Sequence, residues 1–198
     1  MRKVIVSMNI SLDGFMADPH AALDWHFKSW DEEMARNAYE QLKKMDTILL
    51  GRVTYQAMAN YWPLLAKYEA ANNRDIEYAE MMNSYTKIVF SRTLETVEWK
   101  NARLIKENIR EEIYTMKQQP GKDMVIYGSG SIVKTLHQLD LIDEYHLLVH
   151  PILLGKGKPL FEKAGDKVDM TFLNTKTLSS GVVILNYQLH DHFQLHIC

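Results

Sequence analysis

The feature that most restricts how this chain can fold is the regular alternation of short apolar runs with longer amphipathic segments. The first run, residues 4–8, contains valine and isoleucine and is typical of a strand buried on both faces. Strands separated by helices need crossover connections, which bring them into one largely parallel sheet. The pattern predicts strands at 4–8, 47–50, 87–90, 103–105, 123–127 and 144–151, and helices at 31–45, 53–59, 64–84, 109–117 and 132–139.

The C-terminal region follows a different pattern, because two strand-like runs, 169–178 and 182–189, stand next to each other without a helix between them. The short Ser179-Ser180-Gly181 connection predicts a hairpin, and therefore antiparallel strands at one edge of the sheet. No linker-like segment divides the 198 residues. We therefore expect one three-layer α/β domain spanning residues 1–198, with a mostly parallel central sheet and an antiparallel C-terminal hairpin.

Charge and cysteine content exclude several classes of function. The net charge is −2, which gives no electrostatic basis for binding nucleic acid or an anionic membrane. The apolar start of the chain is interrupted at Ser7 and Asn9, so a signal peptide is not expected. The only cysteine is Cys198, which cannot form an internal disulfide. These features indicate a cytoplasmic protein that acts on a small molecule.

Candidate ligand contacts follow from the strand pattern, because ligands of open α/β sheets bind at the carboxyl ends of the strands. Glycine and hydroxyl residues gather at three of these ends, namely residues 51–55, 91–93 and 128–131. Backbone N–H groups at the start of a helix suit phosphate, and Arg52 and Arg92 add permanent positive charge. Each turn alone could equally be an ordinary connection. Together they predict a phosphorylated nucleotide cofactor.

The glycine-rich turn at 128–131 differs from the two common nucleotide motifs. The Gly-x-Gly-x-x-Gly pattern would need a glycine at the position of Val133, and no Gly-x-x-x-x-Gly-Lys-Ser/Thr segment occurs. A metal site is not expected either. His146 and His150 share one face of a predicted strand but stand roughly 13 Å apart at the usual strand rise.

Five short motifs follow one another along most of the chain. They are Ser11-Leu12-Asp13-Gly14-Phe15-Met16-Ala17, Leu50-Gly51-Arg52-Val53-Thr54-Tyr55, Lys87-Ile88-Val89-Phe90-Ser91-Arg92-Thr93, Tyr127-Gly128-Ser129-Gly130, and Asp143-Glu144-Tyr145-His146 with Pro151-Ile152-Leu153-Leu154-Gly155-Lys156-Gly157. Their order and spacing resemble the dihydrofolate-reductase-like superfamily, and more closely the reductase domain of the bifunctional riboflavin-biosynthesis deaminase/reductase and its stand-alone bacterial relatives. The resemblance covers about residues 3 to 189.

This resemblance implies an NADPH-dependent reductase of a small pterin- or aminopyrimidine-like heterocycle, similar to 5-amino-6-(5-phosphoribosylamino)uracil reductase. The turn formed by Ser91, Arg92 and Thr93 would then lie near the adenosine 2′-phosphate, and this favours NADPH over NADH as the cofactor. The implied cofactor-binding residues are Gly51, Arg52, Thr54, Ser91, Arg92, Thr93, Tyr127, Gly128, Ser129, Gly130 and Ser131.

Residues for the substrate are predicted less directly. Dihydrofolate reductases place an acid after the first strand, and Asp24 is the nearest match, although it could simply cap a short helix. Asp13 is the other candidate acid, although it could be an ordinary turn residue before a glycine. The aromatic side chains of Trp25 and Trp62 could stack on a flat heterocycle or belong to the core. Asn9 and Gly155 complete the predicted substrate contacts.

The sequence leaves open whether the protein is catalytic and how many copies associate. The chain could be a non-catalytic module that binds NADPH or a flavin on the same fold. The resemblance also implies a homodimer formed through the late strands. For that contact we expect an exposed apolar edge strand around residues 147–152, since an unpaired apolar edge promotes association.

Overall fold

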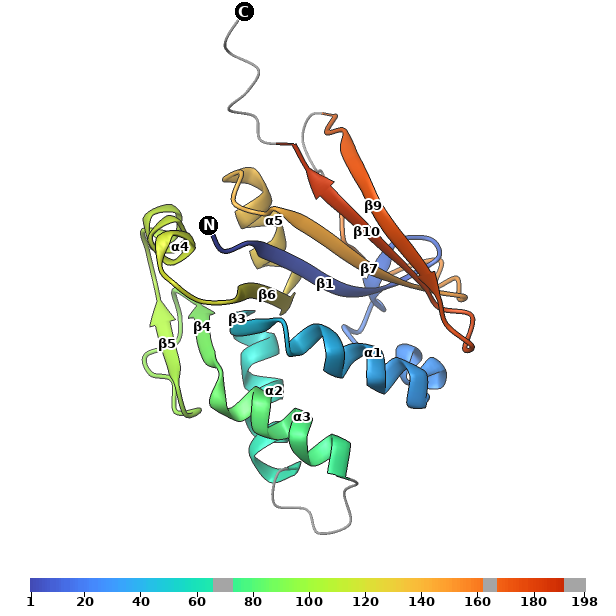
Figure 1. Ribbon diagram of the computed structural model, residues 1–198, viewed down its shortest axis with the longest axis horizontal. Helices are drawn as coiled ribbons and strands as arrows, with labels where there is room; N and C mark the ends of the chain where they lie inside the picture. Colours follow the sequence, from blue (N-terminus) through green and yellow to red (C-terminus); the bar gives the residue numbers. More distant parts are fainter. Residues whose placement is uncertain (66–72, 162–166, 191–198) are drawn as a thin grey trace, which may run out of the picture.

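The computed structural model describes residues 1–65, 73–161 and 167–190, and contains one large sheet with helices on both sides (Figure 1). The strands are β1 (Val4–Ser11), β2 (Phe15–Ala17), β3 (Met45–Gly51), β4 (Thr86–Phe90), β5 (Ala102–Ile105), β6 (Asp123–Gly128), β7 (Glu144–His150), β8 (Lys158–Pro159), β9 (Met170–Thr177) and β10 (Val183–Leu189). The helices are η1 (Asp24–Ser29, a 3-10 helix), α1 (Glu32–Leu42), α2 (Arg52–Leu65), α3 (Asn73–Ser84), α4 (Ile109–Gln118) and α5 (Gly130–Gln138).

The order of the strands confirms the predicted sheet. It runs β5-β4-β3-β6-β1-β7-β10-β9, and β5 through β7 are all parallel to one another. The antiparallel pairings of this sheet are those of β10 with β7 and with β9, as the predicted hairpin requires. β1 lies at the centre, where Val6 pairs with Ile126 of β6 on one side and with Tyr145 of β7 on the other. The protein is therefore an α/β domain with a mostly parallel sheet.

Two hydrophobic layers explain why the strands are apolar on both faces. Successive side chains of a strand point to opposite faces. Val6 belongs to the layer formed with Ile113 of α4 and Leu136 of α5, whereas Ile5 belongs to the layer formed with Met82 of α3. Figure 1 shows α4 and α5 on one side of the sheet and α1, α2 and α3 on the other.

Some local elements differ from the predictions. β2 and β8 were not among the predicted strands, and they make a separate two-stranded sheet. The helix predicted at 53–59 is the longer α2, which also takes in residues 64 and 65. The rest of the helix predicted at 64–84 is α3, and residues 66–72 lie outside the described residues. Cys198 also lies outside them. Within the described part, no helix is both long and apolar enough to cross a bilayer.

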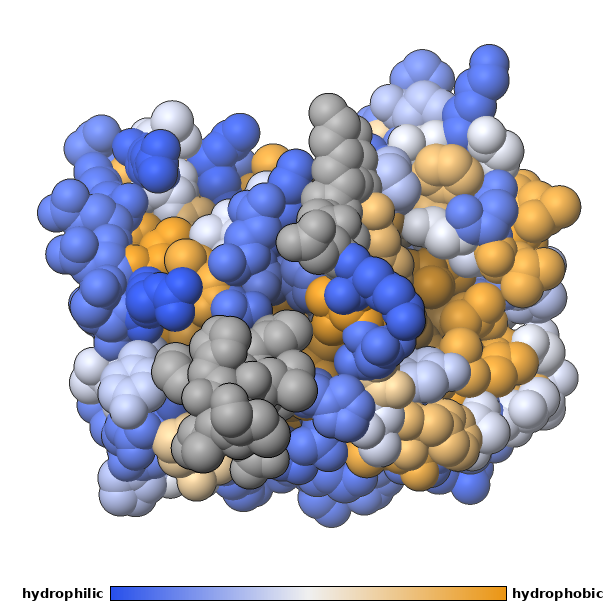
Figure 2. All heavy atoms as spheres, turned by 90° about the horizontal axis from the view of Figure 1, so that it is seen from above, coloured by the Kyte–Doolittle hydropathy of each residue, from blue (hydrophilic) through white to orange (hydrophobic). Residues whose placement is uncertain are grey.

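The C-terminal hairpin lies at one edge of the sheet as predicted, but the strand around residues 147–152 does not. The expected apolar edge strand around residues 147–152 is wrong, because β7 pairs with β1 on one side and with β10 on the other. The two edge strands are β5 and β9, and β9 is exposed along nearly its whole length. Figure 2, which looks down on the molecule from above Figure 1, shows hydrophobic side chains gathered toward the right, where β7, β10 and β9 lie in Figure 1.

Candidate active site

The carboxyl ends of β3 and β6 are packed so closely that only glycine fits between them. A Cβ atom at Gly51 would lie 2.1 Å from the Ser129 hydroxyl oxygen and 3.2 Å from the Ser129 backbone nitrogen. A Cβ at Gly128 would lie 2.8 Å from the hydroxyl of Thr54. The sheet register agrees, since Leu50 is opposite Gly128. Two of the predicted cofactor turns therefore form one continuous surface.

The start of α5 forms the second part of this surface. Ser129 precedes the helix, and its hydroxyl contacts the Ser131 hydroxyl at 2.8 Å, while no side chain caps the helix. The N–H groups of Ile132 and Val133 donate to the Ser129 carbonyl oxygen, so those of Gly130 and Ser131 keep their capacity to donate, as is typical of a phosphate site. A Cβ at Gly130 would lie 2.1 Å from the methyl group of Met16, so β2 covers this helix end from outside.

The turn after β4 supplies the third predicted part. The Ser91 hydroxyl accepts hydrogen bonds from the backbone N–H groups of Thr93 at 3.2 Å and Leu94 at 3.1 Å, which fixes the turn. Arg92 is exposed and pairs with no carboxylate in the described part of the chain. Arg52, the first residue of α2, donates a hydrogen bond to the Gln56 side chain at 3.2 Å and forms no ion pair with a described residue. Both guanidinium groups are available to an anion.

Asp13 holds two loops together. Its carboxylate accepts hydrogen bonds from the Ser11 hydroxyl at 2.6 Å and from the N–H groups of Leu154 at 3.1 Å and Gly155 at 2.8 Å. The Ser11 contact chiefly lowers the pKa of Asp13, and the two N–H groups act in the same direction. Asp13 therefore stays ionised at neutral pH. This is the geometry of a structural anchor, and it does not suit a proton donor.

Asn9 and Trp25 meet at a buried histidine. The Nε2 atom of His150, at the end of β7, donates to the Asn9 amide oxygen at 2.8 Å, and the ring of Trp25 stands edge-on to His150 at 5.2 Å. His150 is 1% exposed and Trp25 is 7% exposed. Burial, with a smaller effect of His26, lowers the pKa of His150 to about 4. His150 Nδ1 and Trp25 Nε1 are both buried without a hydrogen-bond partner among the described residues.

Asp24 does not lie in the partly apolar pocket that the sequence led us to expect. It opens η1, where the neighbouring Trp25 turns inward while the Asp24 side chain is exposed. The expectation about its surroundings is therefore wrong, because Trp25 is the only buried residue of η1 and Asp24 lies on its exposed side. A role of Asp24 in binding or catalysis stays a prediction.

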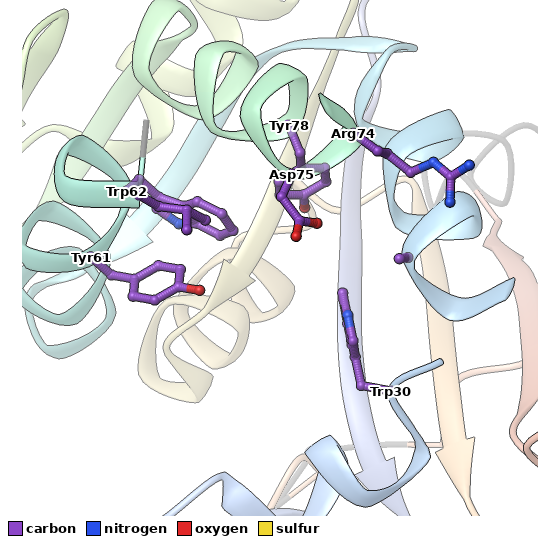
Figure 3. A pocket seen from close by; sticks show the side chains of 8 residues that line it. Trp30, Tyr61, Trp62, Arg74, Asp75 and Tyr78 are labelled. Atoms are coloured by element: carbon purple, nitrogen blue, oxygen red, sulfur yellow. The ribbon is translucent and has the colours of Figure 1, made fainter. Parts of the chain in front are cut away.

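Trp62 lies in a separate aromatic cavity of about 140 Å³ between α1, α2 and α3 (Figure 3). Trp30 and Tyr61 are exposed at 44% and 55% and form its outer wall. Trp62 packs edge-on to Tyr61 at 4.9 Å and against Tyr78 at 5.2 Å, and its indole Nε1 is buried with no hydrogen-bond partner among the residues that the structure describes. The lining residues are Trp30, Ala35, Tyr61, Trp62, Leu65, Arg74, Asp75 and Tyr78.

A pair of tyrosines connects this cavity to the cofactor turns. The Tyr127 hydroxyl donates a hydrogen bond to the Tyr78 hydroxyl. Burial raises the pKa of Tyr78 to about 12 and raises that of Tyr127 well above its usual value. Both side chains therefore stay protonated. Since Tyr127 immediately precedes Gly128, the inner wall of the cavity adjoins the glycine turn of β6.

The structure thus brings some predicted residues together and separates others. The cofactor residues of β3 and β6 form one surface, Asn9 and Trp25 share a cluster, and Gly155 and Asp13 form a loop contact. Sequence reasoning missed His150, although it ends a strand at the expected edge. It also missed Tyr78, whose position depends on how α3 packs on α2. Among the described residues no group of three His, Cys, Asp or Glu side chains is placed to bind a metal.

Comparison with solved structures defines the class of fold. The chain matches a putative riboflavin biosynthesis protein from Shewanella sp. PV-4 with a TM-score of 0.74 and 21% identity, over 96% of this chain and 99% of that one. It matches dihydrofolate reductase from Enterococcus faecalis, solved with NADP(H), with a TM-score of 0.60 and 14% identity, over 96% and 97% of the two chains. The protein has the dihydrofolate-reductase-like fold.

Sequence comparison gives the family. The model of the RibD C-terminal domain family matches residues 2–184, and this chain belongs to that family. It is 36% identical over 186 residues to the uncharacterized protein YyaP of Bacillus subtilis, covering 94% of each chain. The deaminase/5-amino-6-(5-phosphoribosylamino)uracil reductase of Thermotoga maritima matches with a TM-score of 0.66 and 15% identity, over 96% of this chain and 57% of that one.

Proposed function

We propose that this protein is an NADPH-dependent reductase of a small aminopyrimidine- or pterin-like heterocycle. The observation that carries the proposal is the contact of Gly51 with Ser129, which joins two glycine turns into one surface beside an uncapped helix start. Membership of the RibD C-terminal domain family supports a reductase of the riboflavin-pathway type. The uracil reductase activity carried in the name of the Thermotoga protein supports an aminopyrimidine as the substrate class.

The residues at this edge fit a dinucleotide. Gly51, Gly128 and Gly130 let Ser129, Thr54 and Met16 pack directly against the backbone, which brings the two glycine turns and the start of α5 together. The N–H groups that begin α5 suit the pyrophosphate, and Arg52 at the start of α2 adds charge to the same edge. Ser91, Arg92 and Thr93 would hold the 2′-phosphate that distinguishes NADPH from NADH. When bound, the cofactor would supply the hydride.

The side chains of the protein would orient the substrate, and one proton must reach the reduced ring. The aromatic cavity beside Tyr127 would hold the ring next to the nucleotide surface. Asp13 would not donate the proton, because its carboxylate is ionised and already accepts three hydrogen bonds. Asp24, exposed at the start of η1, remains the proposed polar anchor. We expect the proton to come from solvent.

Arg92→Ala tests the cofactor assignment. We expect NADPH binding, followed by equilibrium fluorescence, to weaken roughly tenfold or more because a charge-assisted hydrogen bond to phosphate is lost. NADH binding should change little. Arg110→Ala, which removes an exposed arginine from α4, is the matched control. Equal losses for NADPH and NADH would contradict the 2′-phosphate assignment, and failure of the wild type to bind either would contradict the proposed function.

A second candidate is a module that binds NADPH or a flavin without turnover. Two observations favour this candidate. The Asp24 side chain is exposed to solvent, and the Asp13 carboxylate accepts hydrogen bonds from a neighbouring loop, so neither acid is placed to donate a proton to a substrate. Such a protein would bind NADPH but oxidise none with any heterocycle supplied. A flavin-binding module would be yellow when purified. Steady NADPH oxidation in the presence of an aminopyrimidine would exclude both versions.

A further inference from the structure

Asn9 and His150 form a polar contact near the carboxyl ends of β1 and β7, on the face of the sheet that is proposed to hold the substrate ring. On this face Ile5 of β1 pairs with Val125 of β6, and both belong to one hydrophobic layer. Side chains that are two or four residues further along a strand point to the same face. Tyr127 therefore shares this face with Asn9, and it packs against the same layer.

The 3-10 helix η1 packs over the histidine of this pair. The ring of Trp25 stands edge-on to His150 at 5.2 Å, and the ring of His26 lies 6.1 Å from it. Figure 3 shows Trp30, which directly follows η1, across the aromatic cavity from Trp62. The element that covers His150 therefore leads directly into one wall of the cavity.

The hydrogen bond between the two residues has a defined direction. His150 Nε2 lies 2.8 Å from the Asn9 amide oxygen, and an amide oxygen can only accept. Nε2 therefore carries a proton. Burial lowers the pKa of His150 to about 4, so the ring is neutral at neutral pH and holds this single proton.

This direction decides what Asn9 can offer to a ligand. Its oxygen is engaged by His150, whereas its amide nitrogen donates to no described residue and is not buried. A carboxamide that is fixed in this way presents two N–H donors. The complementary atom of a ligand is an acceptor, such as a carbonyl oxygen of a heterocyclic ring.

We propose that His150 is a positioning residue, which holds the Asn9 carboxamide with its N–H groups toward the substrate, where they bind a carbonyl oxygen of the ring. The proposal rests on the proposed reductase function for the identity of the site. It narrows the substrate class to rings with a carbonyl at this position. An amino group there would set two donors against each other, and sites built around a hydrogen bond reject ligands that cannot make it.

Calorimetry with two matched rings tests the direction of the contact. The probes are diaminouracil and tetraaminopyrimidine, which carries amino groups in place of both carbonyl oxygens. We expect the wild type to bind diaminouracil roughly tenfold or more tightly than tetraaminopyrimidine. Equal binding, tighter binding of tetraaminopyrimidine, or binding of neither ring would overturn the proposal.

Variants of the two residues assign the preference to the named atoms. Asn9→Asp replaces the donor by an acceptor and should reverse the preference. His150→Leu leaves the amide free to turn and should bring the two affinities close together, whereas His150→Gln keeps an N–H donor and should retain part of the preference. His146→Leu is the matched control, because His146 lies on the same face of β7 but contacts Glu144.

A coupled variant separates positioning from a merely structural role. If His150 acts through Asn9, His150→Leu should not alter the preference further in a protein that already carries Asn9→Ala. A histidine that only stabilises the fold would weaken both rings alike, and an unchanged preference in His150→Leu would overturn the proposal. Each variant is first shown to be folded by circular dichroism. If His150→Leu does not fold, an unreversed preference in Asn9→Asp overturns the proposal instead.

The outcome is separable from the test of the proposed function. NADPH binding is followed by the fluorescence of the cofactor itself, in the absence of either ring. A protein that binds NADPH but shows no preference between the rings would keep the reductase proposal and lose this inference. A protein that shows the preference, and loses it in Asn9→Ala, but binds no NADPH would do the reverse.

Discussion

Single residues explain much of the candidate site, and Gly51 is the clearest case. It is needed for its lack of a side chain, because the Ser129 hydroxyl occupies the space that a Cβ would take. The sequence suggested a glycine that admits a ligand. The structure adds that this glycine also lets two strands approach each other.

Gly51→Ala should therefore lower the free energy of unfolding by roughly 1–3 kcal/mol through overpacking. The measurement is chemical denaturation of the single variants and of the double variant. Ser129→Gly removes the colliding hydroxyl, so the double variant should recover most of the loss caused by Gly51→Ala. Strictly additive effects would show that the two residues do not compete for the same space.

His150 should make the protein sensitive to mild acid. Its pKa is lowered from 6.5 to about 4 in the folded protein, so the unfolded chain takes up a proton first as the pH falls. The free energy of unfolding should fall between about pH 6.5 and pH 4, by up to roughly 3 kcal/mol, and then level off for this group. Above pH 6.5 the residue has no such effect.

Denaturation of His150→Gln across this pH range checks the assignment. The variant should show a shallower loss of stability on acidification, whatever its stability at neutral pH. His26 also has a lowered pKa from burial, so His26→Gln should remove a further part of the slope. An unchanged slope in His150→Gln would mean that the histidine is not buried as neutral imidazole.

At the scale of elements, α1 connects the cavity wall to the C-terminal hairpin. Asp31 caps the helix by accepting a hydrogen bond from the Met34 N–H at 2.8 Å. The turn between β9 and β10 packs on the same helix end, where the Ser179 hydroxyl donates to Glu33 at 2.9 Å. Capping could be predicted from the sequence, because Asp31 precedes an amphipathic segment. The hairpin contact could not, because it joins residues far apart in the chain.

Asp31→Ala should lower the free energy of unfolding by about 1 kcal/mol, the usual cost of a lost helix cap. Asp31→Asn, which keeps an acceptor oxygen, should lose less, and thermal denaturation compares the two. A loss well above that of a cap alone would show that the 3.2 Å contact of Ser179 with Asp31 also contributes. Equal stability of Asp31→Ala and wild type would contradict the capping role.

At the scale of the whole molecule, the uncovered side of the hairpin points to association. Phe172 of β9 is 54% exposed, and its ring packs against Tyr187 of β10 at 5.8 Å. Tyr187 lies opposite Tyr145 of β7, which places these rings on the side of the sheet that carries α5. An exposed edge strand next to an exposed apolar face is normally covered. We propose that a second copy of the chain covers it.

Sedimentation velocity of wild type and Phe172→Glu tests this dimer. The charged variant should be monomeric with an unchanged fold, because the side chain is already exposed. Thr171→Glu introduces the same charge on the next residue of β9, which points to the other face, and should leave the dimer in place. A monomeric wild type at working concentration would remove the proposal.

The fold was more predictable from sequence than the site. Apolar periodicity located every strand of the large sheet, because the residues of β1 and β6 are apolar on both faces. The site depends on contacts between elements, which periodicity does not record. Trp62 and Tyr78 come from different helices and meet only because α2 and α3 pack together, whereas Gly51 and Gly128 each end a strand and could be placed in advance.

The central position of β1 has a consequence for how the protein is made. Val4 pairs with Met124, and Ile5 pairs with Glu144, so both neighbours of the first strand come from the second half of the chain. Contacts between residues so distant in sequence form slowly. As the chain leaves the ribosome, β1 emerges well before both of its partner strands, and its apolar surface is exposed until they follow. A strand made before its partners is protected only after they have been synthesised, and a chaperone would encounter it in that interval.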